Sequence, residues 1–173
     1  MMLDDTANLL GVIGLSIADR IHTTAMEVMN RAGETPAALV IIGYGFGPSN
    51  DKLKRVLGLS HPGTVRLVDR LVSDGLVERR KGRDKREIAL YLTDAGRDSR
   101  EDLLAGRLAS IRSLLTPLDT KEQESLDAIL RKLLVAMHPN DMERRRLCRL
   151  CDDRVCKNCP IPADFRSSEP ECE

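Results

Sequence analysis

The stretch LSHPGTVRLVDRLVSDGLVERRKGRDKREIALYL, residues 59–92, contains the pattern that decides the fold. At about 100° per residue, the apolar residues of its first half fall in one sector and the polar residues in the other, as in an amphipathic helix with one buried face. Ser60 suits the N-cap, and Pro62 is tolerated in a first turn whose amides have no intrahelical partner. Gly75 suits the end. We therefore predict a helix between Ser60 and Gly75.

After this helix the apolar residues alternate, first at Leu76-Val77 and then at Ile88, Leu90 and Leu92, which predicts two strands with one buried face. Six cations lie within the eight residues 79–86 that join them. Alone, such a charge run is usually a solvated surface. Directly after an arginine-bearing helix, it indicates a winged helix, in which the helix enters the major groove of DNA and the basic tip reaches an adjacent minor groove.

Two shorter helices are predicted before the recognition helix. Thr35-Pro36 has the form of an N-cap followed by proline at the first helical position, so an apolar helix should run from Pro36 to Tyr44. Ser49 is suited to cap a second helix over residues 50–57. This helix leads through Gly58-Leu59 into Ser60, which is the order of a helix-turn-helix.

Long amphipathic helices flank this unit and carry more apolar surface than a small winged helix needs. They are predicted over residues 4–31, from Thr93 to Pro117, and from Thr120, which forms a capping box with Gln123, to about residue 138. We interpret them as a dimerisation layer. The expected fold class is mainly α with a small β-hairpin wing, a winged helix-turn-helix with N- and C-terminal dimerisation helices. The expected domains are a dimerisation helix (1–34), the winged helix-turn-helix (35–98), dimerisation helices (99–140) and a cysteine-rich tail (141–173).

Composition limits the function classes. The 173 residues carry a formal net charge of zero, so affinity for nucleic acid must come from a local patch such as residues 79–86. No transmembrane segment is present, and the first residues lack the basic and apolar regions of a signal peptide. We therefore expect a cytoplasmic protein with reduced thiols and no membrane partner. No catalytic residues are predicted, and we expect no enzymatic activity.

The chain resembles the MarR-type winged-helix transcriptional regulators over roughly residues 5–138. The order and spacing of five motifs carry the resemblance. They are Leu57-Gly-Leu-Ser60, Arg66-Leu-Val-Asp-Arg-Leu71, Gly75-Leu-Val-Glu-Arg-Arg80, Asp84-Lys-Arg86 and Leu92-Thr93-Asp-Ala-Gly96. The resemblance implies a homodimer that binds double-stranded DNA at a pseudo-palindromic operator, usually as a repressor released by a small-molecule effector or an oxidant.

The resemblance also assigns roles by position. It implies that Arg86 is the wing arginine that contacts DNA and that Asp84 steadies it. The positions that approach bases and phosphates are Ser60, Pro62, Gly63, Thr64 and Arg66. From the residues themselves we add the cations Arg70, Arg83 and Lys85, and also His61, for which a capping or packing role is an equal alternative.

The tail is not part of the resemblance. It contains Cys148, Cys151, Cys156 and Cys159 in the spacing C-x2-C-x4-C-x2-C. Two such pairs can supply the four thiolates of a tetrahedral zinc site, which we expect to order residues 144–162 as a knob. An iron–sulfur cluster is an alternative, because Cys159 precedes a proline as in its usual motifs. A third alternative is that the thiols form disulfides or bind no metal in a flexible tail.

The sequence therefore predicts a homodimeric, sequence-specific transcriptional regulator whose release depends on an effector or on the metal or redox state of the tail. Two other function classes stay open. The tail is compatible with a thiol-dependent redox or metal-transfer protein, although no βαβ pattern surrounds either cysteine pair, as a thioredoxin-like site requires. The other is a winged helix used only for protein contacts. The arginines at 66, 70, 83 and 86 do not favour it.

Overall fold

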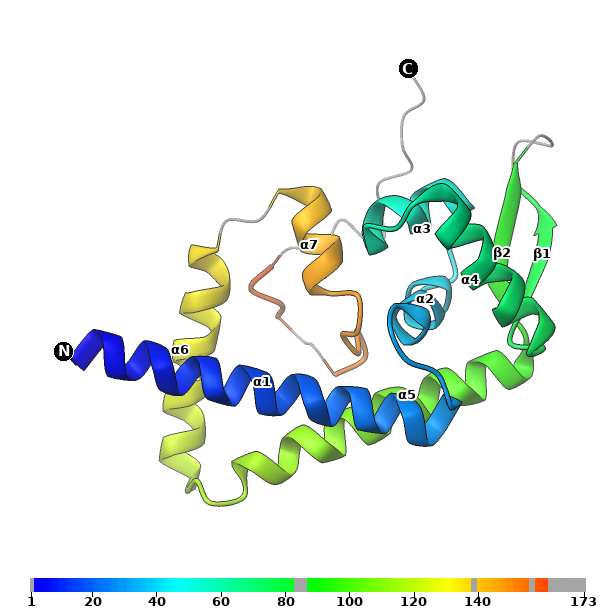
Figure 1. Ribbon diagram of the computed structural model, residues 1–173. Helices are drawn as coiled ribbons and strands as arrows, with labels where there is room; N and C mark the ends of the chain where they lie inside the picture. The colour runs from blue at the N-terminus through cyan, green and yellow to red at the C-terminus, as the bar shows by residue number, and fades with distance from the viewer. Residues whose placement is uncertain (1, 83–86, 138–139, 156–157, 162–173) are drawn as a thin grey trace.

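The computed structural model describes residues 2–82, 87–137, 140–155 and 158–161. These residues form a mainly helical molecule with one antiparallel hairpin, which confirms the predicted winged-helix fold (Figure 1). In chain order the elements are α1 (Met2–Met29), α2 (Thr35–Ile42), α3 (Asn50–Leu57), α4 (His61–Ser73), β1 (Val77–Lys81), β2 (Ile88–Leu92), α5 (Asp94–Arg112), the 3-10 helix η1 (Ser113–Leu115), α6 (Thr120–Ala136) and α7 (Asp141–Leu147).

The core of the winged helix forms around α2. This helix, TPAALVII, is apolar on all sides, and all eight of its residues are buried. A helix without a polar face has to be surrounded by other elements. It is enclosed by the apolar faces of α3 and α4 and by the root of the hairpin. The residues that these three elements contribute are Leu53, Val56, Leu57, Leu67, Val68, Leu71, Val77, Leu90 and Leu92.

The helix-turn-helix begins and ends where its capping residues predict. The Ser49 side chain accepts a hydrogen bond from the Lys52 amide, and the Ser60 side chain accepts one from the Gly63 amide, at 3.4 and 3.2 Å. Gly58 ends α3 with a φ of 68°, a left-handed conformation that glycine adopts without strain. The turn between α3 and α4 is therefore fixed by local chemistry, and the predicted bounds of both helices are confirmed.

Two predicted helix starts were wrong by one residue. Thr35 is the first residue of α2 rather than its N-cap, and its side chain is buried in the core. The capping box of α6 is formed by Asp119 and Glu122, not by Thr120 and Gln123. An aspartate carboxylate caps as well as a hydroxyl does, and Glu122 places a negative charge in the first turn, where the helix dipole favours it.

The wing pairs β1 with β2 from Val77 opposite Leu92 to Lys81 opposite Ile88. The predicted alternation in β2 is only partly correct, because Ile88 is 56% exposed whereas Ala89 is buried. The loop before α3 explains the difference. Gly47 of this loop lies against the side chains of Ala89 and Tyr91, so the loop covers the face of β2 that was expected to meet solvent. The next residue, Pro48, accepts a hydrogen bond from the Leu90 amide at 3.1 Å through its carbonyl.

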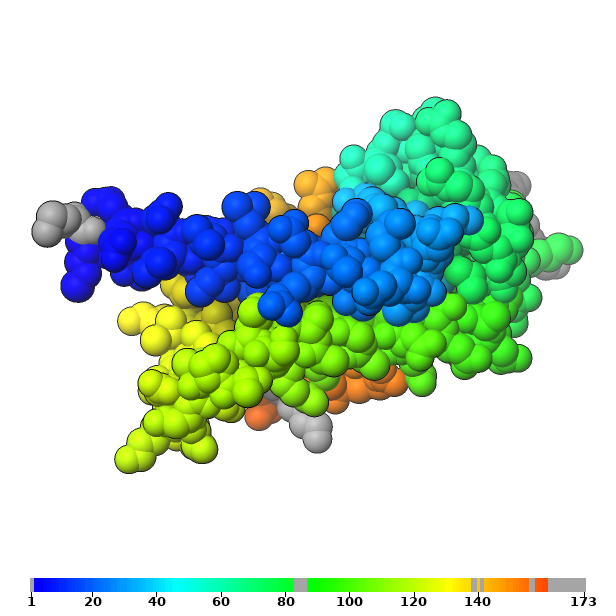
Figure 2. All heavy atoms as spheres, turned by 60° about the horizontal axis from the view of Figure 1, so that its bottom comes forward, coloured from blue at the N-terminus to red at the C-terminus, as the bar shows by residue number. Residues whose placement is uncertain are grey.

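The long helices leave the winged helix together. Helices α1 and α5 pack along each other, and the N-terminal part of α1 projects away from the winged helix (Figure 2). Helix α6 also lies away from the winged helix, and its Arg131 donates a hydrogen bond to the Asn158 carbonyl of the tail at 2.7 Å. Helix α1 ends at Met29, before the predicted end, because Asn30 takes a positive φ of 49°. Many apolar side chains on α1 and α6 are exposed in the single chain. Within the described ranges, no helix combines the length and apolar content that crossing a membrane requires.

The tail returns to the winged helix. Helix α7, which was not predicted from the sequence, begins at a capping box formed by Asn140 and Glu143 and packs against α3. Leu150 packs against the core and Ile161 is buried. The described part of the tail is therefore docked on the domain. Helix α7 was not predicted because its seven residues are mostly charged and show no apolar periodicity.

Candidate nucleic-acid interface

Helix α4 presents the residues predicted to approach DNA in its first turn. The side chains of Ser60, His61 and Pro62 are exposed, while Gly63 is half-buried. A Cβ atom at Gly63 would lie 3.1 Å from the Ser60 hydroxyl that caps the helix, so a larger residue would press on the cap. His61 Nδ1 lies 4.0 Å from an Asp51 carboxylate oxygen. These residues therefore form one exposed turn at the start of the recognition helix.

Thr64 differs from its prediction. Its side chain is fully buried, and its hydroxyl donates a hydrogen bond to the Ser60 carbonyl oxygen at 3.0 Å. The hydroxyl therefore supports the first turn of α4 from inside and does not face solvent. The burial of Thr64 could not be predicted from its position in the motif, since a threonine in the first turn of a helix can lie on the buried or on the exposed face.

The two arginines of the recognition helix point away from the core. Arg66 and Arg70 are exposed, on the side of α4 opposite its buried residues. Between them, Asp69 forms an ion pair with Arg79 of β1. This pair joins the recognition helix to the wing, and it is partly exposed, so its contribution is to orientation more than to stability.

The wing presents further cations. Arg80 pairs with Glu78, and its guanidinium carbon lies 5.0 Å from the centre of the Tyr91 ring. A guanidinium over an aromatic face is held by the ring quadrupole and stays available for other contacts. The predicted tip residues lie outside the described residues, and their roles stay predictions. They are Arg83, Asp84, Lys85 and Arg86.

The root of the wing is fixed to α5. The Thr93 hydroxyl donates a hydrogen bond to the Gly75 carbonyl at 2.6 Å and accepts one from the Gly96 amide at 3.0 Å. The Thr93 amide donates to the Leu76 carbonyl at 3.1 Å. Thr93 thus caps α5, as predicted, and at the same time holds the chain that leaves α4. These hydrogen bonds of Thr93 therefore fix the recognition helix and the wing relative to α5.

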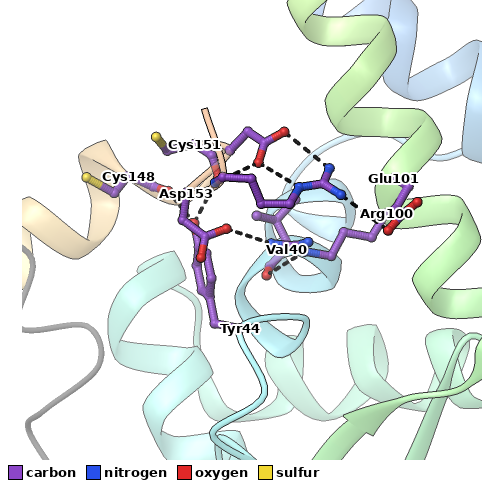
Figure 3. A network of polar contacts seen from close by, with 9 residues as sticks. Val40, Tyr44, Arg100, Glu101, Cys148, Cys151 and Asp153 are labelled. Carbon is purple, nitrogen blue, oxygen red and sulfur yellow. Dashed lines mark hydrogen bonds and ion pairs between the residues drawn. The ribbon is translucent and has the colours of Figure 1, made fainter. Parts of the chain in front are cut away.

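A polar network connects the tail to α2 and α5 (Figure 3). The Tyr44 hydroxyl lies 3.1 Å from the Cys148 carbonyl oxygen and 3.0 Å from that of Cys151. Arg100 of α5 donates to the Val40 carbonyl at 3.4 Å, and its guanidinium lies 3.6 Å from an Asp153 carboxylate oxygen. The network therefore attaches the cysteine-containing turn to the centre of the molecule.

Burial sets the protonation of this network. It raises the pKa of Tyr44 above the usual range, and the nearby Cys151 and Asp153 raise it further, so the hydroxyl stays a hydrogen-bond donor. Hydrogen bonds from Arg154 lower the pKa of the Asp152 carboxyl, against the effect of its burial. Arg154 also reaches Glu101 of α5 at 3.2 Å. Asp152 is therefore an ionised part of the tail attachment.

We expect the contribution of Asp152 to stability to be lost in acid. Its folded-state pKa is lowered, so the contribution is fully present above the unfolded pKa, about 4, and disappears as the pH falls through the folded value. Asp152→Asn should lower the free energy of unfolding by about 1 kcal/mol near neutral pH, because Arg154 is half exposed and its charge is screened. Urea titrations of both proteins should converge as the pH falls below the folded-state pKa of Asp152. A difference that stays constant with pH would contradict this role.

The cysteines are partly placed. Cys148, Cys151 and Cys159 are half-buried, and Cys156 lies outside the described residues. The Cys151 amide donates to the Cys148 carbonyl at 2.9 Å, which closes a tight turn, and both thiol groups point away from Tyr44 (Figure 3). Among the residues with described positions, no group of three or more histidine, cysteine or acidic side chains is arranged to hold a metal ion. The zinc site stays a prediction.

Sequence reasoning missed Tyr44, Arg100 and α7. One signal was available for Arg100, which precedes Leu103 and Leu104 by three and four residues and therefore shares their buried face of α5. Tyr44 gave no signal, because its partners are backbone carbonyls of a segment more than a hundred residues away.

Comparison with known proteins agrees with this geometry. Residues 36–87 match a model of the MarR family. The chain is similar to the transcriptional repressor MprA of Escherichia coli (strain K12), with 33% identity over 84 residues, which are 48% of this chain and 48% of the repressor. The alignment thus spans about half the length of the curated relatives that it matches.

Two solved structures share the fold. YusO from Bacillus subtilis has a TM-score of 0.68 and 22% identity, over 80% of this chain and 96% of that one. A variant of S. aureus MepR bound to an oligodeoxyribonucleotide has a TM-score of 0.60 and 20% identity, over 77% and 98%. The family match covers the helix-turn-helix and most of the wing, and the solved structures extend the agreement to the flanking helices. Residues 36–87 therefore match the MarR family, and the described residues share the fold of MarR-type winged-helix proteins.

Proposed function

We propose that this protein is a sequence-specific, DNA-binding transcriptional repressor that acts as a homodimer on a pseudo-palindromic operator. The observation that carries the proposal is the recognition helix, whose Arg66 and Arg70 are exposed and whose Asp69 is paired with Arg79 of the wing. Arginine on such a helix is the residue most often used to read guanine in the major groove. The similar protein MprA is named a repressor, and the similar MepR variant was solved with an oligodeoxyribonucleotide.

The proposal is tested by removing one arginine from each DNA-facing element. Arg66→Ala and Arg86→Ala should each weaken binding to the preferred duplex by about 1–3 kcal/mol if the arginine contacts a base edge. Arg112→Ala, at the far end of α5, is the matched control and should bind normally. Unchanged affinity at fixed salt would remove the affected arginine from the interface.

A homodimer is supported by the apolar side chains that the single chain leaves exposed on α1 and α6. Soluble monomers rarely expose contiguous apolar surface of this kind. A two-fold dimer through these helices would address two half-sites about one helical turn, or roughly 10 base pairs, apart. The MarR-type fold also favours a regulator over a thiol oxidoreductase, since the described strands form only the wing hairpin.

We further propose that Cys148, Cys151, Cys156 and Cys159 bind one Zn²⁺ ion and that its loss, or oxidation of the thiols, weakens operator binding. The support is their spacing and the tight turn that places the first two thiols on one side. The backbone carbonyls of the same turn are hydrogen-bonded to the hydroxyl of Tyr44, which directly follows α2 and its cap Gly43, so a change in the tail reaches the DNA-binding core directly. A small-molecule effector is the alternative cause of release.

Metal content tests the cysteine proposal. The variant with all four cysteines changed to serine should lose one zinc ion per chain and bind the operator more weakly, whereas Cys172→Ser, the control, should keep both properties. Lost zinc with unchanged DNA affinity would leave a structural site only. Zinc retained by the variant would overturn the ligand assignment. A brown, iron-containing wild-type protein would show that the cysteines bind an iron–sulfur cluster and not zinc.

A further inference from the structure

The surface where α7 meets α3 carries a group of cations that neither the recognition helix nor the wing includes. Helix α7 packs against α3, and Met142 contacts the core beneath them. The guanidinium of Arg146 lies over the turn of the helix-turn-helix, because a Cβ atom at Gly58 would be only 3.1 Å from its Nη2 atom. The tail therefore brings a positive charge to the end of α3.

Other cations of α3 lie in the same region. Lys52 is half-buried, and its pKa is lowered by that burial and then by the charges of Arg145 and Arg55. The side chains of Arg55 and Arg146 are exposed. As far as the described residues extend, no carboxylate lies within ion-pair distance of Lys52, Arg55 or Arg146, and the nearby Asp51 pairs instead with Lys54. Like charges held together in this way repel, and a bound anion would relieve the repulsion.

The orientation of the patch points to a particular anion. In Figure 1, α3, the start of α4 and α7 lie on one side of the molecule, and the end of β1 at Lys81 and the start of β2 at Ile88 point to the same side. In helix-turn-helix proteins the first helix crosses the DNA backbone while the second enters the groove. A cationic surface beside α3 then lies at the level of the phosphates rather than the bases.

We propose that Lys52, Arg55 and Arg146 form a phosphate-binding patch through which the tail and α3 together hold the DNA backbone outside the recognition helix and the wing. The inference rests on the proposed DNA binding and adds to it a contact made by the tail. A competing role for Arg146 is purely local. A cation at the C-terminus of α3 stabilises the exposed carbonyl groups there, and that role needs no DNA.

Salt dependence separates the two roles. The full-length protein is titrated against a random-sequence duplex of about 30 base pairs, with KCl varied between about 50 and 200 mM. Each lost phosphate contact should reduce the slope of log affinity against log salt by about 0.9. We expect this reduction for Arg146→Gln and for Arg55→Gln, which removes an exposed side chain and leaves the core intact. Lys132→Gln, on the exposed surface of α6, is the control and should keep the wild-type slope.

Each outcome decides a different question. Wild-type slopes for Arg146→Gln and Arg55→Gln would overturn the patch while DNA binding stands, and a lower melting temperature of Arg146→Gln alone would assign Arg146 to the end of α3. An equal reduction for Lys132→Gln would show a general effect of net charge and also overturn the patch. A wild-type protein that binds no duplex would overturn the proposed function, and the patch with it.

Discussion

Gly96→Ala is expected to lower the free energy of unfolding by about 3 kcal/mol. A Cβ atom at this position would lie 1.9 Å from the Leu76 carbonyl oxygen and 2.9 Å from its carbon. Both are backbone atoms, and the oxygen is already held by the Thr93 amide. Overpacking usually lowers the free energy of unfolding by about 1–3 kcal/mol. We expect a loss at the upper end of this range, because the backbone atoms of Leu76 cannot move away from the added methyl group. The cost exceeds the roughly 1 kcal/mol that alanine gains over glycine within a helix.

Gly14→Ala is the matched control for this experiment. Gly14 lies within α1, and a Cβ atom there would meet no atom within 4 Å. The same substitution should therefore stabilise the protein slightly, by about 0.5–1 kcal/mol. Urea unfolding should show a lower free energy of unfolding for Gly96→Ala and a slightly higher one for Gly14→Ala. A Gly96→Ala protein as stable as the wild type would show that α5 does not pack on the root of the wing as described.

Leu130→Asp is expected to weaken the proposed dimer by about 4 kcal/mol, roughly a thousandfold in dissociation constant. Leu130 is 45% exposed in the single chain and belongs to an apolar stripe along α6. An aspartate on a buried apolar interface has no partner there, so its desolvation is not offset. Sedimentation equilibrium at micromolar concentration should show a wild-type dimer and a variant monomer. Residues that share the stripe are Leu126, Ile129, Leu133 and Met137.

Ala128→Asp makes the same change of charge on the opposite side of α6 and should leave the dimer intact. A wild-type monomer would contradict the dimer itself. A dimeric Leu130→Asp protein would instead show that this stripe of α6 is not the interface.

Local chemistry made most of the winged helix predictable. Ser49 and Ser60 cap α3 and α4 through hydrogen bonds to amides three residues ahead, and Gly58 and Gly75 take the positive φ that the ends of these helices require. Such capping interactions involve residues only three or four positions apart, so they can be predicted from the local sequence alone. Thr93 is a similar case.

Contacts between distant segments were not predictable in the same way. Ala89 is buried because the loop at Gly47 and Pro48 covers β2, and Thr64 is buried because the first turn of α4 rests on the core. Tyr44 finds its partners in the tail. In each case the burial depends on a segment whose position is set by the tertiary fold, and no periodicity within the element reveals it.

Selection of bound duplexes from a random library tests whether the protein is a dimeric repressor that binds a specific operator. The full-length protein should enrich an inverted repeat whose half-site centres lie about 10 base pairs apart, because two recognition helices related by a two-fold axis read the same sequence on opposite strands. The Arg66→Ala protein should enrich the repeat poorly or lose one of its base preferences. A library that shows no enriched sequence with the wild-type protein, or only a single asymmetric site, would contradict a dimeric operator-binding repressor.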